Sequence, residues 1–568
     1  MSRVKVSWRG WRCSLVLAWA ILLGSGLSGT ALAAPPQLVV VVSVDQWAYE
    51  YFTRLEGRFE DDGLVQLVRR EGAWFTNCHH PHALTYTAPG HAILLTGAYP
   101  EQNGIVDNST FDRQLNTQVY CVADPGARLI GPEVDDLPVS PRRLMVETVG
   151  DRLKETSQGA SKVFGVAVKD RASILMAGHR ADAAYWMSED GWWITSSAYR
   201  KDLPPYLRQL NEQRCLAPYA GQIWQRLKAP DRYVNGPQED SFGERPQYDM
   251  SADFPHQMTK ADNPYFVYQL CCSPFGNEVT LRAAMTILSE EGLGKDEHAD
   301  LLLINLSSND YVGHAFGPES LEAEDMTYRT DQMLGAWVRQ VNELLPDVPW
   351  TIYVTADHGV CPIPERLQRA GQTAGRNQWG GTDARGSYEL VRAFLERNIR
   401  QSMGLGQEVR PIIQAVCDGQ VFFVAQHPTL SDEQLIAAQR ACCEALKKLP
   451  EVEVAFAKAD LMGDGPLDDL QQAYRRSLHP TRSGDVLFGL KRNFIYGTSG
   501  TTHGSPWEYD SHVPLMVWER AVGGDRSWQP GSYDQRVSPG SIAATIARQL
   551  NIDPPRGAQD GPLPLTAR

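Results

Sequence analysis

The chain has 568 residues, of which 42% are hydrophobic and 21% are charged, and its formal net charge is −14. This length exceeds what one small hydrophobic core needs, so we expect a large catalytic domain with insertions. The composition is that of an ordinary globular protein. An acidic surface does not suit binding to nucleic acid or to anionic membranes, so these two partner classes are excluded.

Residues 1–33 have the pattern of a signal peptide. Four basic residues precede a mostly apolar run from Ser14 to Leu27, and Ala31-Leu32-Ala33 supplies small residues for cleavage. An uncleaved membrane anchor is the weaker alternative, because glycine and serine residues interrupt the apolar run. Cleavage removes four positive charges and no acidic residue, which lowers the formal charge from −14 to −18. We therefore predict a periplasmic or secreted protein without stable membrane association.

Nine cysteines follow the predicted cleavage site. In an oxidising compartment some of them are expected to pair, with Cys271-Cys272 and Cys442-Cys443 as candidates. None of the nine has zinc-finger spacing. The prediction is a set of scattered disulfides together with a buried free thiol, with the pairing left open.

Strand-like runs recur along the chain. The first, Leu38–Val44, is a continuous run rich in valine, which is typical of a buried parallel strand. Similar runs follow at Lys162–Val168, Asp300–Leu306, Trp350–Thr355 and Val513–Trp518. Helical patterns lie near Leu144–Thr156, Glu278–Glu291, Ala323–Leu345 and Ile542–Leu550. This alternation predicts an α/β fold with a mostly parallel central sheet flanked by helices.

Two stretches do not follow the alternation, and we predict both as insertions that cover the active site of one catalytic domain, residues 34–568. Residues 186–275 are rich in Trp, Tyr, Pro and Cys. Residues 366–495 contain a helix of their own, which Ser431 opens with Gln434 as its capping-box partner. The same stretch has strand-like runs near Val421–Ala425 and Glu451–Phe456.

Polar side chains that can hold metals follow the predicted strands. Asp45 comes directly after the first, Asp310 shortly after the third, and Asp357-His358 after the fourth. In parallel sheets, ligands bind at the carboxyl ends of the strands. Asp310 and His314 are about one helical turn apart, so both can face one ion. His503 adds an imidazole in a glycine-containing turn.

The most specific local motif is Thr85-Tyr86-Thr87-Ala88-Pro89-Gly90-His91, followed by Leu95-Thr96-Gly97. Pro89 and Gly90 suit a tight turn that could present the Thr87 hydroxyl at a helix N-terminus, where backbone N–H groups favour anions. A hydroxyl needs a metal or a base before it can attack phosphorus. A helix-capping threonine is the alternative, and the six metal-capable side chains elsewhere favour a nucleophile.

This motif resembles the nucleophile turn of the alkaline phosphatase superfamily, specifically that of the phosphate-irrepressible alkaline phosphatases with a threonine nucleophile. The resemblance runs from Asp45 to about His512 and implies an alkaline phosphatase-like fold. Sulfatases use a Cys-x-Pro-x-Arg frame, whereas the corresponding positions here are Thr87, Pro89 and His91. Sulfatase chemistry is therefore disfavoured.

The resemblance also implies two zinc sites. One would be held by Asp310, His314 and His503. The other would be held by Asp45, Asp357 and His358, with Thr87 bound to it. Both sites would serve hydrolysis of phosphate monoesters through a phosphothreonine.

Lys169-Asp170-Arg171 follows the second predicted strand, and the two cations are spaced so that both can point the same way. In the threonine-type monoesterases a Lys-x-Arg pair, together with an asparagine that Asn108 matches, contacts the phosphoryl oxygens. The diesterase branch has the asparagine and lacks the pair. A solvated basic strand end is the alternative reading of Lys169 and Arg171.

We predict an exported two-zinc alkaline phosphatase whose partners are small-molecule phosphate monoesters. A nucleotide pyrophosphatase or phosphodiesterase of the same superfamily is the alternative enzyme. A catalytically inactive, metal-dependent binding protein is the alternative of another class. The sequence leaves the oligomeric state and the physiological substrate open.

Overall fold

The computed structural model describes residues 35–234, 236, 240–377, 384–522 and 526–565. The predicted signal peptide therefore lies outside the described residues. Ten strands form one central sheet in the order β20-β2-β19-β12-β1-β11-β6-β7-β8-β5. Their bounds are β1 Leu38–Val44, β2 Ala73–His79, β5 Leu129–Ile130, β6 Val163–Ala167, β7 Ala183–Met187, β8 Trp193–Ser196, β11 Asp300–Leu306, β12 Trp350–Thr355, β19 His512–Arg520 and β20 Gly531–Tyr533.

The middle of the sheet is parallel. Strands β12, β1, β11, β6 and β7 pair in parallel, in that order. Strand β19 runs antiparallel between β12 and β2, and β8 runs antiparallel to β7. The predicted α/β class with a mostly parallel sheet is confirmed.

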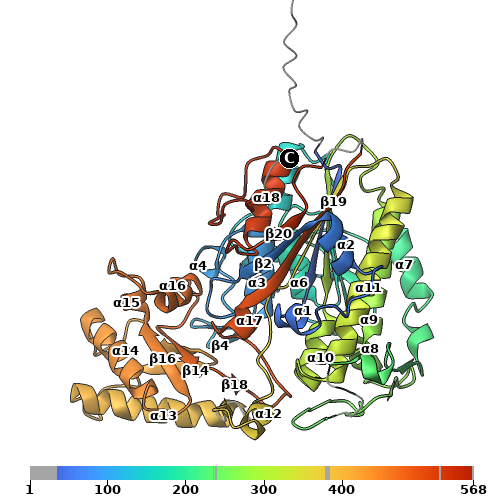
Figure 1. Cartoon of the computed structure of the whole chain (residues 1–568). Coiled ribbons are helices and arrows are strands. Elements are labelled where there is room, and N and C mark those ends of the chain that lie inside the picture. The colour runs from blue at the N-terminus through green and yellow to red at the C-terminus, as the bar shows by residue number, and fades with distance from the viewer. Residues whose placement is uncertain (1–34, 235, 237–239, 378–383, 523–525, 566–568) are drawn as a thin grey trace, which may run out of the picture.

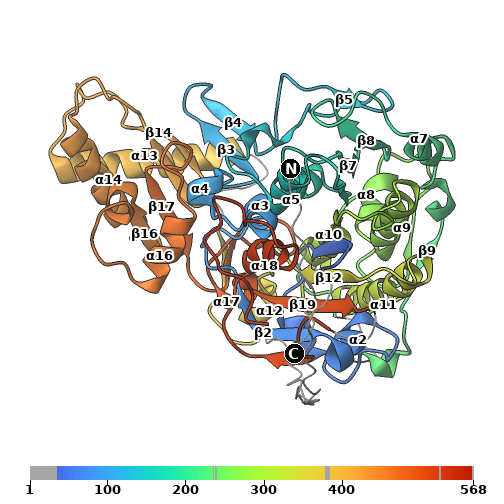
Figure 2. The same ribbon diagram turned by 90° about the horizontal axis from the view of Figure 1, so that it is seen from above.

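Helices cover both faces of the sheet (Figures 1 and 2). One face carries α3 (Thr87–Thr96), α5 (Val149–Thr156), α6 (Asp170–Ala177) and α18 (Ser541–Gln549). Helix α6 packs on β6 and β7, α3 packs on α6, and α18 packs on α3 and α5. The other face carries α2 (Leu64–Glu71), α9 (Pro274–Glu290), α10 (Ser308–Phe316) and α11 (Leu321–Leu344).

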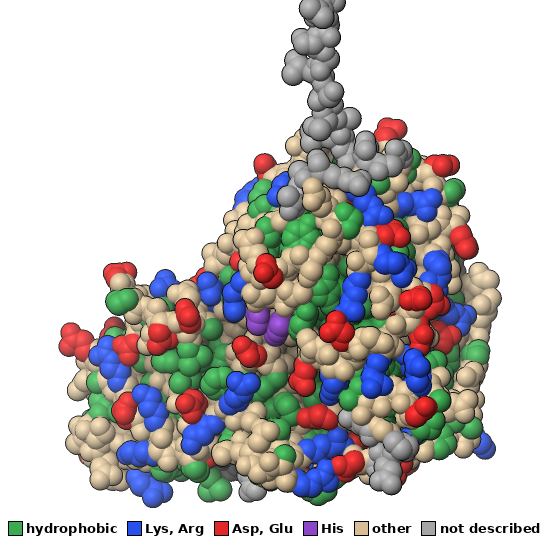
Figure 3. Space-filling view, in the orientation of Figure 1, with side chains coloured by type: hydrophobic (Ala, Val, Ile, Leu, Met, Phe, Trp, Pro, Cys, Tyr) green, Lys and Arg blue, Asp and Glu red, His purple; other side chains and the backbone are tan. Residues whose placement is uncertain are grey.

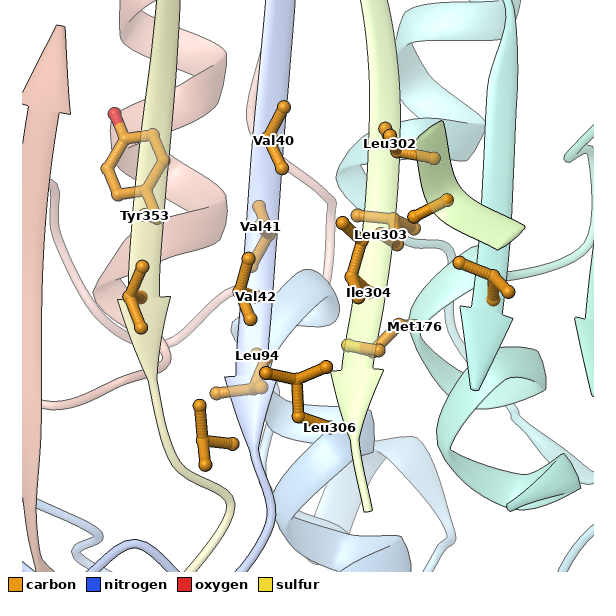
Figure 4. Packing of buried hydrophobic residues seen from close by; sticks show 14 of the residues in the cluster. Val40, Val41, Val42, Leu94, Met176, Leu302, Leu303, Ile304, Leu306 and Tyr353 are labelled. Carbon is orange, nitrogen blue, oxygen red and sulfur yellow. The ribbon is translucent and has the colours of Figure 1, made fainter. Parts of the chain in front are cut away.

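The core lies between these layers. Figure 4 shows Val40 and Val42 of β1 beside Leu303 of β11, with Leu94 of α3 near the carboxyl ends of the strands. These side chains are fully buried. Burying a valine or leucine side chain contributes roughly 1.5–3 kcal/mol. This burial stabilises the central strands and so fixes the positions at which the loops after them begin.

Residues 366–377 and 384–495 form a lobe beside the sheet, drawn in yellow to orange in Figure 2. The lobe has a four-stranded sheet in the order β14-β15-β17-β16 and a hydrophobic cluster of its own. Its elements are α13 Ala384–Met403, β14 Ile413–Cys417, β15 Gln420–Phe423, α14 Asp432–Leu446, β16 Val452–Ala457, α16 Asp469–Arg476 and β17 Val486–Leu490. Ser431 and Gln434 form the predicted capping box at the start of α14.

The segment 186–275 differs from the prediction at its start. Trp186 lies in β7 and Trp193 in β8, and both strands belong to the central sheet. The remainder folds beside the sheet as α7 Pro205–Glu212, β9 Ile223–Trp224, β10 His256–Gln257 and α8 Phe266–Cys271. The predicted boundary at 186 was wrong, because β7 and β8 are short, fully buried strands that extend the central sheet beyond β6.

Two further predictions need correction. The helix expected from Leu144 begins at Val149, because the Thr148 hydroxyl accepts from the Asp151 N–H and the Asp151 carboxylate accepts from the Thr148 N–H. The expected disulfides are absent among the described residues, where all nine cysteines are free thiols, eight of them buried. Cys442 and Cys443, for example, pack inside the lobe cluster as small apolar side chains.

Among the described residues, no helix is both long enough and apolar enough to cross a membrane. On the face drawn in Figure 3, acidic and basic side chains are interspersed, without an extended basic patch.

Candidate metal centre and active site

The predicted polar residues meet at the carboxyl ends of four adjacent strands. Asp45 follows β1, Asp357 follows β12, Asp310 lies in the first turn of α10 after β11, and Lys169 follows β6. All four side chains are buried. Because these strands are neighbours and parallel, residues from four distant parts of the chain converge at one edge of the sheet.

The first metal-capable group consists of Asp310, His314 and His503. Asp310 Oδ1 lies 3.2 Å from His314 Nε2 and 3.7 Å from His503 Nε2. The Nδ1 atoms of both histidines form hydrogen bonds to backbone carbonyl groups. His314 Nδ1 donates to Thr501 O and His503 Nδ1 donates to Thr85 O, both at 2.8 Å. These bonds leave each Nε2 free to face an ion, as in metal sites generally.

The second group consists of Asp45, Asp357 and His358. His358 Nε2 lies 3.2 Å from Asp357 Oδ2 and 3.5 Å from Asp45 Oδ1, and its Nδ1 donates to Gly359 O at 2.9 Å. Asp45 Oδ1 and Asp357 Oδ2 are buried and accept no hydrogen bond from any described residue. Such orphaned acceptors fit a divalent cation, and the mixed oxygen and nitrogen donors suit zinc among other ions.

Lys169 connects the two groups. Its Nζ lies 2.8 Å from Asp45 Oδ2 and 2.5 Å from Asp310 Oδ2. The ammonium group therefore lies between one carboxylate of each group. Without bound metal, it partly offsets the negative charge that the groups bring together.

The shared burial shifts the pKa values of these residues. Burial and the neighbouring Asp357 raise the pKa of Asp45. Burial alone would lower the pKa of His358, but Asp357 and then Asp45 reverse this and raise it to about 9. Burial also works against ionisation of Asp357, yet the neighbouring His358 holds its pKa well below the usual range. The second group thus holds a proton on His358 that a metal ion must displace.

Thr87 is the first residue of α3 and is almost completely buried. Its Oγ1 lies 3.4 Å from His358 Nε2, beside the second group. Pro89 and Gly90 belong to the first turn of α3 itself and not to a preceding turn, which corrects the expected local structure. A Cβ on Gly90 would lie 2.4 Å from Asp357 O, so glycine is what allows α3 to approach this strand end.

His91 is a site residue to which the sequence assigned no role. It accepts from Asn305 Nδ2 at Nε2 (2.8 Å), and its Nδ1 donates to Thr87 O (2.8 Å) and lies 3.2 Å from Asp357 Oδ2. Burial lowers its pKa to about 4, so the imidazole is neutral. Its position four residues after Thr87 on one helix was the available signal.

Gln46 was also missed. Its backbone N–H donates to Asp357 Oδ1 at 3.2 Å, and its Nε2 donates to Asp310 Oδ1 at 2.6 Å. One residue therefore orients carboxylates of both groups. The only signal in the sequence was its place directly after Asp45.

The remaining predicted residues are Asn108 and Arg171, and each has a hydrogen-bond partner near the site or the adjoining cavity. Asn108 Oδ1 accepts from the backbone N–H of Ala88 at 2.9 Å, which places its amide next to the start of α3. Arg171 donates to the hydroxyl of Tyr120 at 3.4 Å, and that hydroxyl donates to Asp170 at 2.5 Å. Lys169 and Arg171 both line a cavity of about 550 Å³.

The chain has relatives among known proteins. The family described as type I phosphodiesterase / nucleotide pyrophosphatase matches residues 39–421. Alkaline phosphatase PhoK from Sphingomonas sp is 32% identical, over 93% of this chain and 91% of PhoK. A protein from Myroides odoratus named calcium-transporting ATPase is 30% identical, over 92% of this chain and 93% of its own. The crystal structure of alkaline phosphatase PafA matches with a TM-score of 0.82 at 27% identity, covering 94% of this chain and 99% of PafA.

The fold and the relatives define a phosphomonoester hydrolase of the alkaline phosphatase superfamily. The chain belongs to the type I phosphodiesterase / nucleotide pyrophosphatase family, and within it to the alkaline phosphatases with a threonine nucleophile.

Proposed function

We propose that the protein is an exported two-zinc alkaline phosphatase that hydrolyses phosphate monoesters through a phosphothreonine at Thr87. One observation carries the assignment of the nucleophile. The buried Thr87 hydroxyl begins a helix and lies 3.4 Å from His358 Nε2, within a ring of metal-capable side chains. The N-terminus of α3 adds backbone N–H groups that favour an anion beside this hydroxyl.

We assign one zinc ion to Asp310, His314 and His503, and the other to Asp45, Asp357 and His358. Two divalent cations held there would supply positive charge for the entering and leaving oxygens of an in-line displacement. The orphaned Asp45 Oδ1 and Asp357 Oδ2 support this assignment. The bonds from Gln46 keep the two groups in a fixed relation.

In the first step, the Thr87 hydroxyl loses its proton and Oγ forms a bond to phosphorus while the bond from phosphorus to the substrate alcohol breaks. The alcohol oxygen leaves with the electron pair and takes up a proton. In the second step, water attacks the phosphothreonine, the Oγ–P bond breaks, and phosphate is released as Thr87 regains its proton. Asn108, Lys169 and Arg171 hold the phosphoryl oxygens, because a loose transition state needs positioning and charge more than covalent help.

Replacing Lys169 and Arg171 by alanine should remove the preference for monoesters. A monoester has an extra charged oxygen that these cations would bind, so we expect kcat/KM for nitrophenyl phosphate to fall by roughly 10²–10³-fold. Activity on bis-nitrophenyl phosphate should change far less. Lys295→Ala is a matched control, because Lys295 is exposed at the opposite end of β11.

The same assay tests the alternative enzyme, a diesterase or nucleotide pyrophosphatase, which the description of the matched family favours. Faster hydrolysis of the bis-ester by the unmodified protein would replace the monoesterase assignment. ATP belongs in the substrate panel because one relative carries an ATPase name.

Metal loading of the metal-free protein should depend on pH. His358 has a pKa raised to about 9, and a bound metal requires its neutral form. Apparent zinc affinity should therefore increase as pH rises towards 9, with a proton released on binding. The charged His358 stabilises the metal-free fold fully below pH 6.5, and this contribution disappears as pH rises through 9.

Calorimetric zinc titrations in buffers with different heats of ionisation measure the released proton. Affinity that stays constant between pH 6.5 and 9, without proton release, would contradict the assignment of His358. His298→Ala serves as the control, since His298 is half exposed and belongs to neither group.

The proposal that the protein is exported depends on the signal-peptide pattern of residues 1–33. The mature protein should be recovered from the periplasm or the medium with Ala34 as its first residue. N-terminal sequencing of the native protein checks this, and an intact N-terminus in the cytoplasm would overturn it.

A further inference from the structure

The cavity of about 550 Å³ beside Lys169 and Arg171 is larger than a phosphoryl group requires. Its walls come from the loop after β5, the β7–β8 turn, the segment before α8, and α10. Figure 2 shows β5, β7, β8 and α8 on the side of the sheet away from the lobe. Lys169 and Arg171, which are proposed to hold the phosphoryl group, are part of this lining, so the cavity adjoins the proposed phosphoryl site.

The charges in this cavity are arranged in two zones. Lys169 is almost fully buried and Arg171 is half-buried, and these two cations form the floor together with one carboxylate, Asp170, which accepts from the Tyr120 hydroxyl. Asp135 and Glu189 are exposed and Asp136 is half-buried, so the carboxylates form the rim. A substrate that spans the cavity meets positive charge at its inner end and negative charge at its outer end.

The rim carboxylates have no cationic partner. Among the described residues, no ion pair involves Asp135, Asp136 or Glu189. Asp136 instead accepts the backbone N–H of Glu189 at 3.3 Å. Burial, together with the nearby Glu189 and Asp190, raises the pKa of Asp136. Added positive charge at the rim would relieve this repulsion.

Aromatic rings form one wall between the two zones. The ring of Tyr248 lies 4.2 Å from that of Tyr268 and 5.1 Å from that of Tyr265, and Tyr268 lies 5.6 Å from Tyr311. Lys169 Nζ already lies 5.2 Å from the centre of the Tyr311 ring. Tyrosine faces attract cations, and aromatic walls combined with acidic groups recognise quaternary ammonium ligands.

We propose that this cavity is a subsite for the alcohol part of the substrate and favours phosphate monoesters of ammonium alcohols, such as choline phosphate and ethanolamine phosphate. The phosphoryl group lies at Lys169 and Arg171, and the ammonium group lies against the tyrosine wall within reach of Asp136 and Glu189. This inference rests on the proposed phosphomonoesterase activity.

Other classes of substrate match the cavity less well. An acidic alcohol would place a second negative charge beside three carboxylates that lack counter-ions. A neutral alcohol would fill the space but would not compensate the negative charge of the rim carboxylates. Only a zwitterionic monoester is complementary to both zones.

The test compares two substrates of nearly equal shape, choline phosphate and 3,3-dimethylbutyl phosphate, in which carbon replaces the ammonium nitrogen. We expect kcat/KM to be about tenfold higher for choline phosphate, within the range of a cation–π contact supported by carboxylates. The double variant Asp136→Asn, Glu189→Gln should bring the ratio close to one. Tyr268→Leu should lower the ratio as well, by about threefold.

Asp347→Asn is the matched control. Asp347 is exposed in the loop before β12, at the opposite end of the sheet, and its variant should keep the unmodified ratio. Equal rates on both substrates by the unmodified protein would overturn the subsite while leaving the phosphatase intact. A ratio that survives in the double variant would do the same. If the protein hydrolyses none of the three substrates, that is choline phosphate, 3,3-dimethylbutyl phosphate and nitrophenyl phosphate, the proposed activity is wrong. The subsite, which rests on that activity, is then wrong as well.

Discussion

Replacing Thr87 by alanine should reduce turnover of nitrophenyl phosphate by roughly three orders of magnitude or more, as for other nucleophiles whose partners act as a unit. The hydroxyl is the proposed attacking group, and its oxygen lies 3.4 Å from His358 Nε2 of the second metal-capable group. Metal content should stay near that of the unmodified protein, because the six carboxylate and imidazole side chains remain. Steady-state kinetics and metal analysis on the same preparation measure both quantities.

Two further variants separate chemistry from folding. Thr87→Val keeps the branched shape without the hydroxyl and should be as inactive as the alanine variant. Thr87→Ser keeps the hydroxyl and should retain substantial activity. Acid quenching during turnover, followed by mass spectrometry, should find phosphate on Thr87. Near-normal turnover by the valine variant, or phosphate on another residue, would remove Thr87 from the mechanism.

Removal of metal should abolish activity and lower the melting temperature. Asp45, Asp357 and Asp310 are buried close together, and Lys169 is the cation that bridges two of them. A metal present at about 1,000 times its Kd stabilises the folded state by about 4 kcal/mol, so stripping it should lower the melting temperature by several degrees. Calorimetry and activity assays before and after dialysis against a chelator measure the two effects.

Adding zinc back should restore both activity and melting temperature. Asp357→Asn should lower metal content and activity together, whereas His298→Ala should change neither. Full activity in a preparation shown to be free of divalent metal would end the two-metal assignment.

Much of the architecture could be predicted because its signals are local. The valine run Leu38–Val44 and the apolar runs at Asp300–Leu306 and Trp350–Thr355 are all strands with these bounds. Continuous apolar runs identify buried parallel strands. The polar residues that directly follow such runs must then share one edge of the sheet. This is why Asp45, Asp310 and Asp357 could be grouped before any geometry was known.

What was missed depends on contacts between distant residues. His91 lies in the motif around Thr87, but its bond to Asn305, 214 positions away, and its approach to Asp357 exist only in the folded chain. Gln46 matters through its bond to Asp310 across the sheet. The strand β8 is only four residues long, so its alternation was too short to detect. Most of the cysteines are likewise buried as free thiols because of how the folded chain packs, and the number of cysteines in a sequence does not reveal that packing.

The place of β19 has a consequence for how the protein is made. This strand comes from the last tenth of the chain and inserts between β12 and β2, inside the sheet and not at its edge. Until it emerges, β2 and β12 are unpaired on the edges that β19 later joins, so a nascent chain cannot close its core. His503 emerges just before it. A ribosome-bound chain that ends before β19 therefore leaves β2 and β12 without the strand that joins them, and the central sheet stays divided until the last tenth of the protein is made.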